Sequence, residues 1–437
     1  MRPLSGLVNE ASAIAVMSNL EPIAIELRCR QVRSRAFLHD AAMKQTLQYR
    51  LYRQLARVKV AASEYRGDAL WIAGKEKHSG EPLSLFYYGT LLCYDYLVDS
   101  FYAEHSIVRE RESVSVRHGS RLLTTESGSD LVIGDIAWPY HLGMPKNGFL
   151  RLPPQISHRI ALPAEWSSVE QRFSARKTTR DELRKVEKFG LTFRTTHDAA
   201  TIDRFYDTMY LPYGRRRHAD LADLEPRDVI QKTAARGALI EVLHGDSVVG
   251  GGVLQRVDRV MQFMWLGVVD GLDAALQSAV GAALYCFSMR HAIDVGCSEI
   301  NLMYAPAQLN NGIHRYKRKL GARIGNDWPY GQLLMKVAHL TPAVVSLFAN
   351  TPFAAMGARR GLHARIMVAQ DDLSPEDVLK IASYYACDGF ESIKILSMRP
   401  VSEQVLRGDY AAEDVPMRIE VRDLTRSANA AADFCRV

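Results

Sequence analysis

The sequence predicts a mixed α/β (α+β) protein with more than one domain, and three observations support this prediction. The chain has 437 residues, which is longer than one hydrophobic core ordinarily requires. Strand-like and helix-like runs alternate between residues 191 and 337. A connection with three prolines, RLPPQISHRIALPAEW, precedes this segment. The expected domains are residues 1–160, 161–340 and 341–437.

The composition is typical of a folded globular protein. Apolar residues make up 47% of the chain and charged residues 24%. The net charge of +6 is modest, and Lys and Arg are scattered with local clusters, so a broad nucleic-acid surface is not required. We therefore expect a small-molecule or glycan-precursor substrate and no DNA partner, with tRNA as an alternative.

Cysteine spacing and hydropathy bear on metal sites, compartment and membrane contact. The six cysteines form no C-x-x-C pair and no His-Cys ligand spacing, which predicts buried free thiols and no metal. No run reaches the 18 apolar residues of a spanning helix. The nearest run, 341–358, contains Pro342 and Pro352 and predicts two packed helices. The N-terminus lacks a secretory pattern, so the expected location is the cytoplasm. The oligomeric state is not determined.

The first domain is expected to mix strands and helices. Aromatic and β-branched residues favour strands at 22–27, 69–73 and 83–88, and a helical run covers residues 41–60.

The second domain opens with a highly charged helix over residues 179–189. Thr179 and Glu182 have the spacing of a capping box. Gly190 follows at the position where a helix end favours a left-handed residue. This glycine therefore predicts the end of the helix.

The elements after Gly190 alternate in type, and short turns predict two hairpins among the central strands. In order they are strand 191–195, helix 199–210, strands 238–243, 248–254 and 260–266, helix 273–295, strand 299–304, helix 311–320 and strand 332–337. The third domain adds strand 364–370, helix 374–387 and strand 392–398.

Two stretches resemble a known family. PQISHRIALPAEWSSVEQRFSARKTTRDELRKVEKFGLTFR, with Arg184, Lys185 and Gly190, is similar to the linker and basic helix of bacterial GNAT-type acyltransferases related to the Fem aminoacyl transferases. That group includes proteins assigned to cellulose and exopolysaccharide biosynthesis. INLMYAPAQLNNGIHRYKRKLGARI resembles their strand–loop–helix, which ends in a basic residue and Leu-Gly. The resemblance covers about 170 residues and implies a GNAT fold, in two tandem copies of which the N-terminal one is degenerate.

The resemblance implies an enzyme that moves an acyl group from acyl-CoA to an amine of a sugar, amino acid or related metabolite. Acetyl-CoA is the first expected donor, and polysaccharide or cell-envelope biosynthesis the expected setting. In Fem-type relatives the donor is aminoacyl-tRNA instead. A non-catalytic binding module of the same fold is the third interpretation. The sequence contains no P-loop, G-x-S-x-G or H-E-x-x-H motif.

The family holds the acyl-CoA pyrophosphate on backbone N–H groups at the start of a helix, where the helix dipole favours anions. By this resemblance the cofactor would contact Val268, Ser278, Gly281 and Ala283. Ser278 departs from the Gln or Arg that the family has there. The other interpretation is that Gly281 and Ala283 only allow the helix to pack closely on the sheet.

Tyr304, Tyr316 and Lys317 are the candidate catalytic residues. In acetyltransferase relatives a tyrosine often protonates the leaving thiolate, and it lies four residues before the glycine of this helix. Lys317 has that position here, and Tyr316 precedes it. Lys317 matches the basic residue of Fem-like relatives, where an ammonium could contact carboxylate or phosphate. A solvated helix face or a half-buried aromatic is the alternative.

Tyr213, Arg216 and Arg217 are the candidate substrate-binding residues, in a loop that faces the acceptor in related enzymes. A solvated loop without a ligand is the alternative. Glu241 and Asp270 are candidate general bases by location only, as is Asp294.

Overall fold

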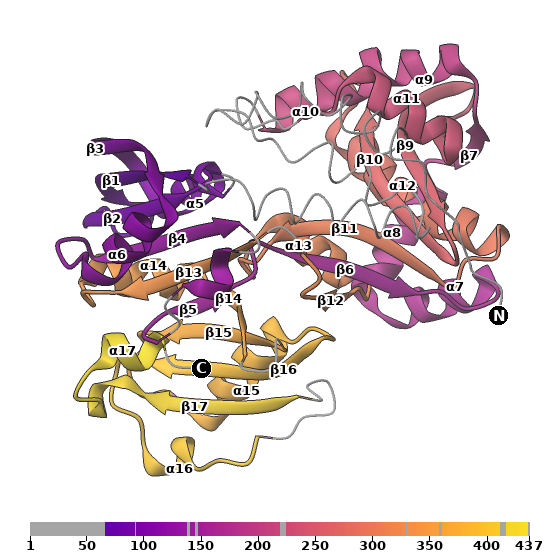
Figure 1. Ribbon diagram of the computed structural model, residues 1–437. Coiled ribbons are helices and arrows are strands. Elements are labelled where there is room, and N and C mark those ends of the chain that lie inside the picture. The colour runs from indigo at the N-terminus through magenta and orange to yellow at the C-terminus, as the bar shows by residue number, and fades with distance from the viewer. Residues whose placement is uncertain are drawn as a thin grey trace, which may run out of the picture.

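The computed structural model describes residues 66–91, 93–137, 140–144, 147–218, 224–328, 331–357, 361–410 and 417–435. These residues form three β-sheets, which we call A, B and C, with helices packed on them (Figure 1). The predicted strand at 22–27 and the predicted helix at 41–60 lie outside the described residues.

Sheet A contains six strands, and the predicted strands at 69–73 and 83–88 are confirmed as β1 and β2. Its strands are β1 (Arg66–Glu76), β2 (Pro82–Gly89), β3 (Tyr102–Ser115), β4 (Leu131–Ala137), β5 (Leu150–Leu152) and β13 (Gly331–Val337). Their order is β3-β1-β2-β4-β13-β5. Strand β2 runs parallel to β4, and the chain between them forms α5 (Tyr94–Phe101), β3 and α6 (Val116–Thr125).

Sheet B contains seven strands in the order β12-β6-β11-β10-β9-β8-β7. They are β6 (Gln155–Ala161), β7 (Leu191–Thr196), β8 (Ala238–His244), β9 (Ser247–Val257), β10 (Val260–Val268), β11 (Glu299–Pro306) and β12 (Arg323–Gly325). The predicted strands of the second domain and both hairpins are confirmed, because β8, β9 and β10 pair antiparallel in sequence order.

In the described part of the chain, eight helical segments accompany sheet B. They are α7 (Trp166–Ala175), α8 (Lys177–Lys188), α9 (Ala199–Phe205), the π-helical turn η2 (Tyr206–Tyr210), α10 (Leu211–His218), α11 (Arg227–Arg236), α12 (Ala274–Asp294) and α13 (Gly312–Lys319). The predicted capping box is wrong: α8 begins before Thr179, whose hydroxyl donates to the Phe173 carbonyl. The predicted left-handed Gly190 is confirmed, with φ +56°.

The two larger sheets exchange strands (Figure 1). In sheet B, β10 runs parallel to β11, and β6 and β12 follow in the sheet. In sheet A, β2 runs parallel to β4, and β13 and β5 follow in the sheet. Strand β13 thus has the place in sheet A that β6 has in sheet B. Strand β6 therefore leaves the N-terminal half to enter sheet B, and β13 returns to sheet A. Because of this exchange, cuts at 160 and 340 do not separate the two sheets.

Sheet C lies in the C-terminal part of the chain. Its elements are α14 (Pro342–Asn350), β14 (Phe353–Met356), β15 (Leu362–Val368), α15 (Pro375–Tyr385), β16 (Phe390–Ser397), α16 (Glu403–Leu406), β17 (Arg418–Asp423) and α17 (Ala430–Cys435). The predicted helix pair over 341–358 is wrong in its second half. After Pro352 the chain forms β14, which pairs with β15 and buries all four of its residues.

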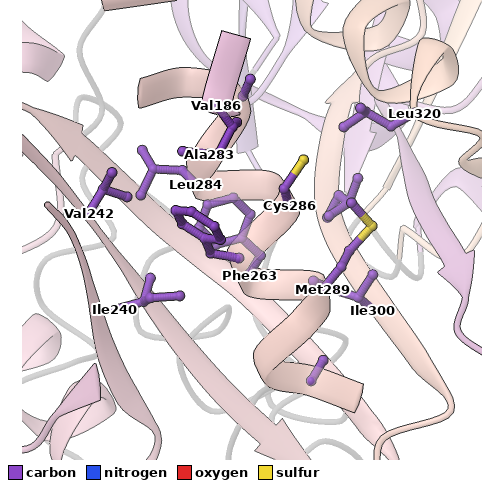
Figure 2. Packing of buried hydrophobic residues seen from close by; sticks show 14 of the residues in the cluster. Val186, Ile240, Val242, Phe263, Ala283, Leu284, Cys286, Met289, Ile300 and Leu320 are labelled. Atoms are coloured by element: carbon purple, nitrogen blue, oxygen red, sulfur yellow. The ribbon is translucent and has the colours of Figure 1, made fainter. Parts of the chain in front are cut away.

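The core of sheet B forms where α12 packs on the strands (Figure 2). Leu284 and Cys286 of the helix lie in the same buried cluster as Ile240 and Phe263 of the sheet. The run of glycines in β9 keeps this layer thin: a Cβ on Gly250 would lie 2.6 Å from the Val280 side chain. A bulkier residue there would separate helix from sheet.

Two further observations on the described ranges concern membrane-spanning helices and cysteines. No helix there is long and apolar enough to cross a membrane. The five described cysteines are buried and free, as predicted.

Candidate functional site

The central feature of sheet B is a fork between its parallel strands. Strands β10 and β11 pair only from Val260–Glu299 to Gln262–Asn301. Beyond this point β10 continues beside β9 as far as Val268, and β11 continues beside β6 as far as Pro306. The strands thus separate toward their carboxyl ends, which is where open α/β sheets ordinarily bind ligands.

Asn301 and Met303 form the base of the fork. The Asn301 amide nitrogen donates to Oε1 of Gln262 at 2.7 Å, and its oxygen accepts from the Met303 N–H at 2.9 Å. Met303 has φ +61°, a conformation that costs a non-glycine residue roughly 1–2 kcal/mol. One hydrogen bond contributes about 0.5–1.5 kcal/mol, so the bond from Met303 offsets much of this cost.

Lys317 of α13 contacts β11, the strand that forms one side of the fork. Its side chain is buried, and Nζ donates to the Tyr304 carbonyl at 2.9 Å. Burial lowers the pKa of Lys317 to about 7, so a large fraction of the amine is neutral near neutral pH. Lys317 is therefore not a residue of a solvated helix face. The half-buried Tyr304 ring packs edge-on against Trp328, with centroids 5.0 Å apart.

A buried histidine pair lies beside Lys317. His158 Nε2 and His314 Nδ1 are 2.9 Å apart, and both side chains are fully buried. Burial together with the nearby Lys317 charge lowers the pKa of His158 to about 2. Burial together with the Arg318 and Lys317 charges lowers the pKa of His314 to about 4. Sequence reasoning missed this pair, since only the exchange of β6 brings His158 to α13.

Tyr316 of α13 faces α8, where a carboxylate binds it. Its hydroxyl donates to Glu182 at 3.0 Å, and Glu182 also accepts from Lys185 at 2.8 Å and Lys319 at 2.6 Å. Burial and the Glu182 charge raise the pKa of Tyr316 well above its usual value. Although burial opposes it, the lysine hydrogen bonds lower the pKa of Glu182. Tyr316 is thus a weak proton donor.

Glu182 is a functional candidate that sequence reasoning missed. Its spacing from Thr179 suggested a helix cap, but the carboxylate instead holds α8 against α13. The only available signal was a carboxylate among basic residues of one helix, which is ordinarily a solvated pattern.

The predicted substrate residues lie on a helix, α10, and not in a loop. Tyr213 is half-buried, with the guanidinium of Arg217 5.7 Å from its ring centroid. Arg216 pairs with Asp270, which was a general-base candidate. Glu241, another such candidate, is held by Arg194 and Arg204. Both carboxylates are therefore engaged in ion pairs.

Aromatic rings connect α12 with α13 and β10. Tyr285 of α12 is half-buried, with its ring centroid 5.2 Å from Tyr316 and 5.1 Å from Phe263. Burial raises the pKa of Tyr285. Tyr213 of α10 and Tyr285 pack against the same core cluster. The fork thus adjoins a surface of tyrosines with cationic side chains.

Three of the predicted cofactor residues lie inside a helix and not at its start. Helix α12 already begins at Ala274, so Ser278, Gly281 and Ala283 lie inside it, where backbone N–H groups bond within the helix. At the actual start, the Asp273 carboxylate accepts from the N–H groups of Ala275 and Leu276. A carboxylate that takes these donors does not fit a pyrophosphate at the same position.

The four predicted cofactor residues have different environments. Val268 is buried and pairs with Gly250 of β9. Ser278 is exposed, and its hydroxyl accepts from Lys185 at 3.1 Å. Ala283 is fully buried in the core, as the packing interpretation predicts. A Cβ on Gly281 would contact nothing within 4 Å, so packing does not require that glycine.

The side chains that ordinarily bind metals are dispersed over the described residues. In that part of the chain, no group of three or more His, Cys, Asp or Glu side chains is arranged to hold a metal ion.

Comparison with solved structures finds several distant likenesses. The C-terminal domain of a putative lysylphosphatidylglycerol synthetase from Agrobacterium fabrum has 10% identity, covering 63% of this chain and 85% of that chain, with TM-score 0.32. FemX has 10% identity, 65% and 88% coverage and TM-score 0.33. A GCN5-related N-acetyltransferase from Kribbella flavida has 11% identity, 67% and 59% coverage and TM-score 0.25. Likenesses this distant support no argument about activity.

Comparison with sequence families is more specific. No curated protein matches the chain. Residues 174–318 match the family model described as an acetyltransferase (GNAT) domain. The match runs from the end of α7 into α13, so it includes both strands of the fork together with α12 and Lys317. The chain therefore contains a GNAT domain with the acyltransferase fold, as the sequence predicts.

Proposed function

We propose that this GNAT domain transfers an acyl group to an amine, and that donor and acceptor meet in the fork between β10 and β11. The observation that carries the proposal is the separation of these parallel strands after Gln262 and Asn301. The separation gives an extended donor access to both strand edges at their carboxyl ends. The acceptor would be an amine of a sugar, an amino acid or a related precursor in polysaccharide or cell-envelope biosynthesis.

The side chains beside the fork suit this chemistry. An attacking amine must be neutral and must lose a proton when the new bond forms, so a group with a pKa near 7 is suited to the transfer. Lys317, whose pKa burial lowers to about 7, meets that requirement beside β11. Exposed Arg217 beside Tyr213 would attract the carboxylate or phosphate of an acidic acceptor.

The donor that the family implies is acyl-CoA, with acetyl-CoA as the first expectation. The start of α12 does not fit its pyrophosphate, because Asp273 occupies the backbone donors there. This observation favours a second candidate function, in which the donor is an aminoacyl ester on tRNA. The basic residues of α8, including the exposed Arg184, would then contact the nucleic acid.

The experiment gives the full-length protein three labelled donors: acetyl-CoA, a longer acyl-CoA and charged tRNA. A panel of amino sugars and amino acids serves as acceptors. Transfer from a CoA thioester that resists ribonuclease supports the first function, and transfer that ribonuclease abolishes supports the second. We expect Lys317→Met to lower the rate at least about 100-fold. Lys232→Met, on the exposed face of α11, is the matched control and should keep full activity.

Two outcomes would contradict the proposal. A protein that folds but transfers nothing from any donor would be a non-catalytic binding module. Full activity of Lys317→Met would remove the lysine from the reaction.

A further inference from the structure

We propose that Asn301 and Met303 form a latch that keeps β11 apart from β10, and that both are positioning residues for acyl transfer. The inference rests on the proposed function, because it names residues that keep the proposed donor site open. Neither residue is suggested by the sequence, where Asn301 and Met303 are ordinary members of a strand-like run.

The first line of evidence is that both ends of the Asn301 amide, the nitrogen and the oxygen, make hydrogen bonds. It is 4% exposed, it donates to Gln262 on β10, and it accepts from Met303 on its own strand. An asparagine is suited to this position because its amide supplies a donor and an acceptor together. The bond to Gln262 lies at the last paired position, so it marks where the two strands stop pairing.

The second line of evidence is the backbone of Met303. Its φ is +61°, and its N–H is bound by the Asn301 side chain. The same residue forms a bulge: Asn301 pairs with Arg159 and Tyr304 with Ser157, so two residues of β11 lie opposite one of β6. A bulge bends its strand and increases the local twist. Strand β11 therefore follows β6 from this point and not β10.

The third line of evidence is the position of Tyr304 directly after the bulge. Its carbonyl is the acceptor for the Lys317 amine. A straight β11 would continue its register with β10 at Phe263, which would close the fork and shift Tyr304 along the strand. The latch thus determines both the opening of the fork and the place of the Lys317 amine.

The test compares Asn301→Ala with the double variant Asn301→Ala/Met303→Gly. Loss of Asn301 should raise the KM for the donor about tenfold, because fewer molecules would have the open fork that binds the donor. The kcat should stay within about twofold, because every molecule that has bound the donor has the open fork. Glycine adopts positive φ without strain, so adding Met303→Gly should return the KM to within about threefold of wild type. Met303→Val alone should raise the KM, because a β-branched residue disfavours positive φ.

The matched control is Asp258→Gly. Asp258 also has positive φ, +54°, but it lies in the turn between β9 and β10, away from the fork. Adding it to Asn301→Ala should not restore the KM. Restoration by both glycines equally would mean that the rescue is a general gain of stability, and it would overturn the latch.

The remaining outcomes separate the latch from the proposed function. If the wild type transfers acyl groups and Asn301→Ala has an unchanged KM, the latch is wrong and the function stands. If the protein uses none of the donors, the proposed function fails. The latch is then tested by the melting temperatures (Tm) of the same variants. Met303→Gly should then cancel most of the fall in Tm that Asn301→Ala causes, whereas additive changes in Tm would overturn the latch.

Discussion

Sheets A and B have the same arrangement around a parallel pair of strands, but the pair is closed in one and open in the other. In sheet A, β2 and β4 stay paired from Leu85–Leu131 to Gly89–Asp135, where β2 ends. In sheet B, pairing ends at Gln262–Asn301 while both strands continue. Among the described residues, sheet B therefore contains this fork and sheet A does not.

The polar residue at the end of each pair explains this difference. Asp135 is buried and accepts from the Tyr87 hydroxyl at 2.7 Å and the Cys93 N–H at 3.0 Å, so it binds β2 and the chain after that strand. Asn301 binds Gln262 of β10 at the last paired position, and it also binds Met303 of its own strand, where β11 has a bulge. Asp135 therefore lies where its strand pair persists to the end of β2, whereas Asn301 lies where its pair ends although both strands continue. The N-terminal copy is degenerate as a site, and it contributes strand β6 to the other copy.

The largest effect should come from opening the closed pair with Asp135→Ala. The change leaves the Tyr87 hydroxyl and the Cys93 N–H buried without their acceptor, so the free energy of unfolding should fall by about 3 kcal/mol. Urea denaturation measures this change. Asp135→Asn keeps an acceptor and should lose less. Acyl transfer per folded molecule should not change, and a loss of transfer would show that sheet A takes part in the reaction.

The next effect concerns pH and Lys317. Burial lowers its pKa from 10.5 to about 7, so between these values the unfolded chain binds a proton that the folded protein does not. The stability of the wild type should therefore rise with pH in this window, by up to about 1.4 kcal/mol per unit, and level off below pH 7. The stability of Lys317→Met minus that of the wild type should shrink from pH 7 to pH 10. A constant difference would mean that Lys317 stays charged in the fold.

A smaller effect is expected at the acceptor side of the fork, where Arg217 lies beside Tyr213 on α10. Arg217→Ala should raise the KM for an acidic acceptor about tenfold with little change in kcat, because the charge contributes to binding only. Arg215→Ala, an exposed neighbour, is the control. Equal effects of both variants would indicate long-range attraction in place of a specific contact.

The smallest effect should follow Tyr316→Phe. Since the Tyr316 hydroxyl already donates to Glu182 and its pKa is raised, it should not serve as the acid of the reaction. We expect kcat to fall less than about threefold and the unfolding free energy to fall by about 1 kcal/mol. A 100-fold fall in kcat would return Tyr316 to the catalytic role that the sequence suggested.

Local pattern was sufficient for much of the fold. Most of the strands and helices from 191 to 337 were predicted, because hydrophobic periodicity and turn residues are properties of neighbouring positions. Helices α10 and α11 and the short strand β12 were not predicted. Gly190 ended its helix for the same reason. Helix α12 begins where the sequence predicts, at Asp273, so Gly281 and Ala283, which the resemblance assigned to the cofactor, lie inside the helix and not at its start.

The tertiary structure decided the site. The sequence by itself determined the GNAT domain and placed Tyr304, Lys317 and Tyr316 near the end of one strand. It did not determine that β6 would bring His158 to His314, that Glu182 would bind Tyr316, or that Asn301 would bind Met303. The first two contacts join residues distant in sequence, and the third depends on a backbone angle that neighbouring strands impose. Such contacts leave no periodic pattern, because their physical cause is the packing of one element against another.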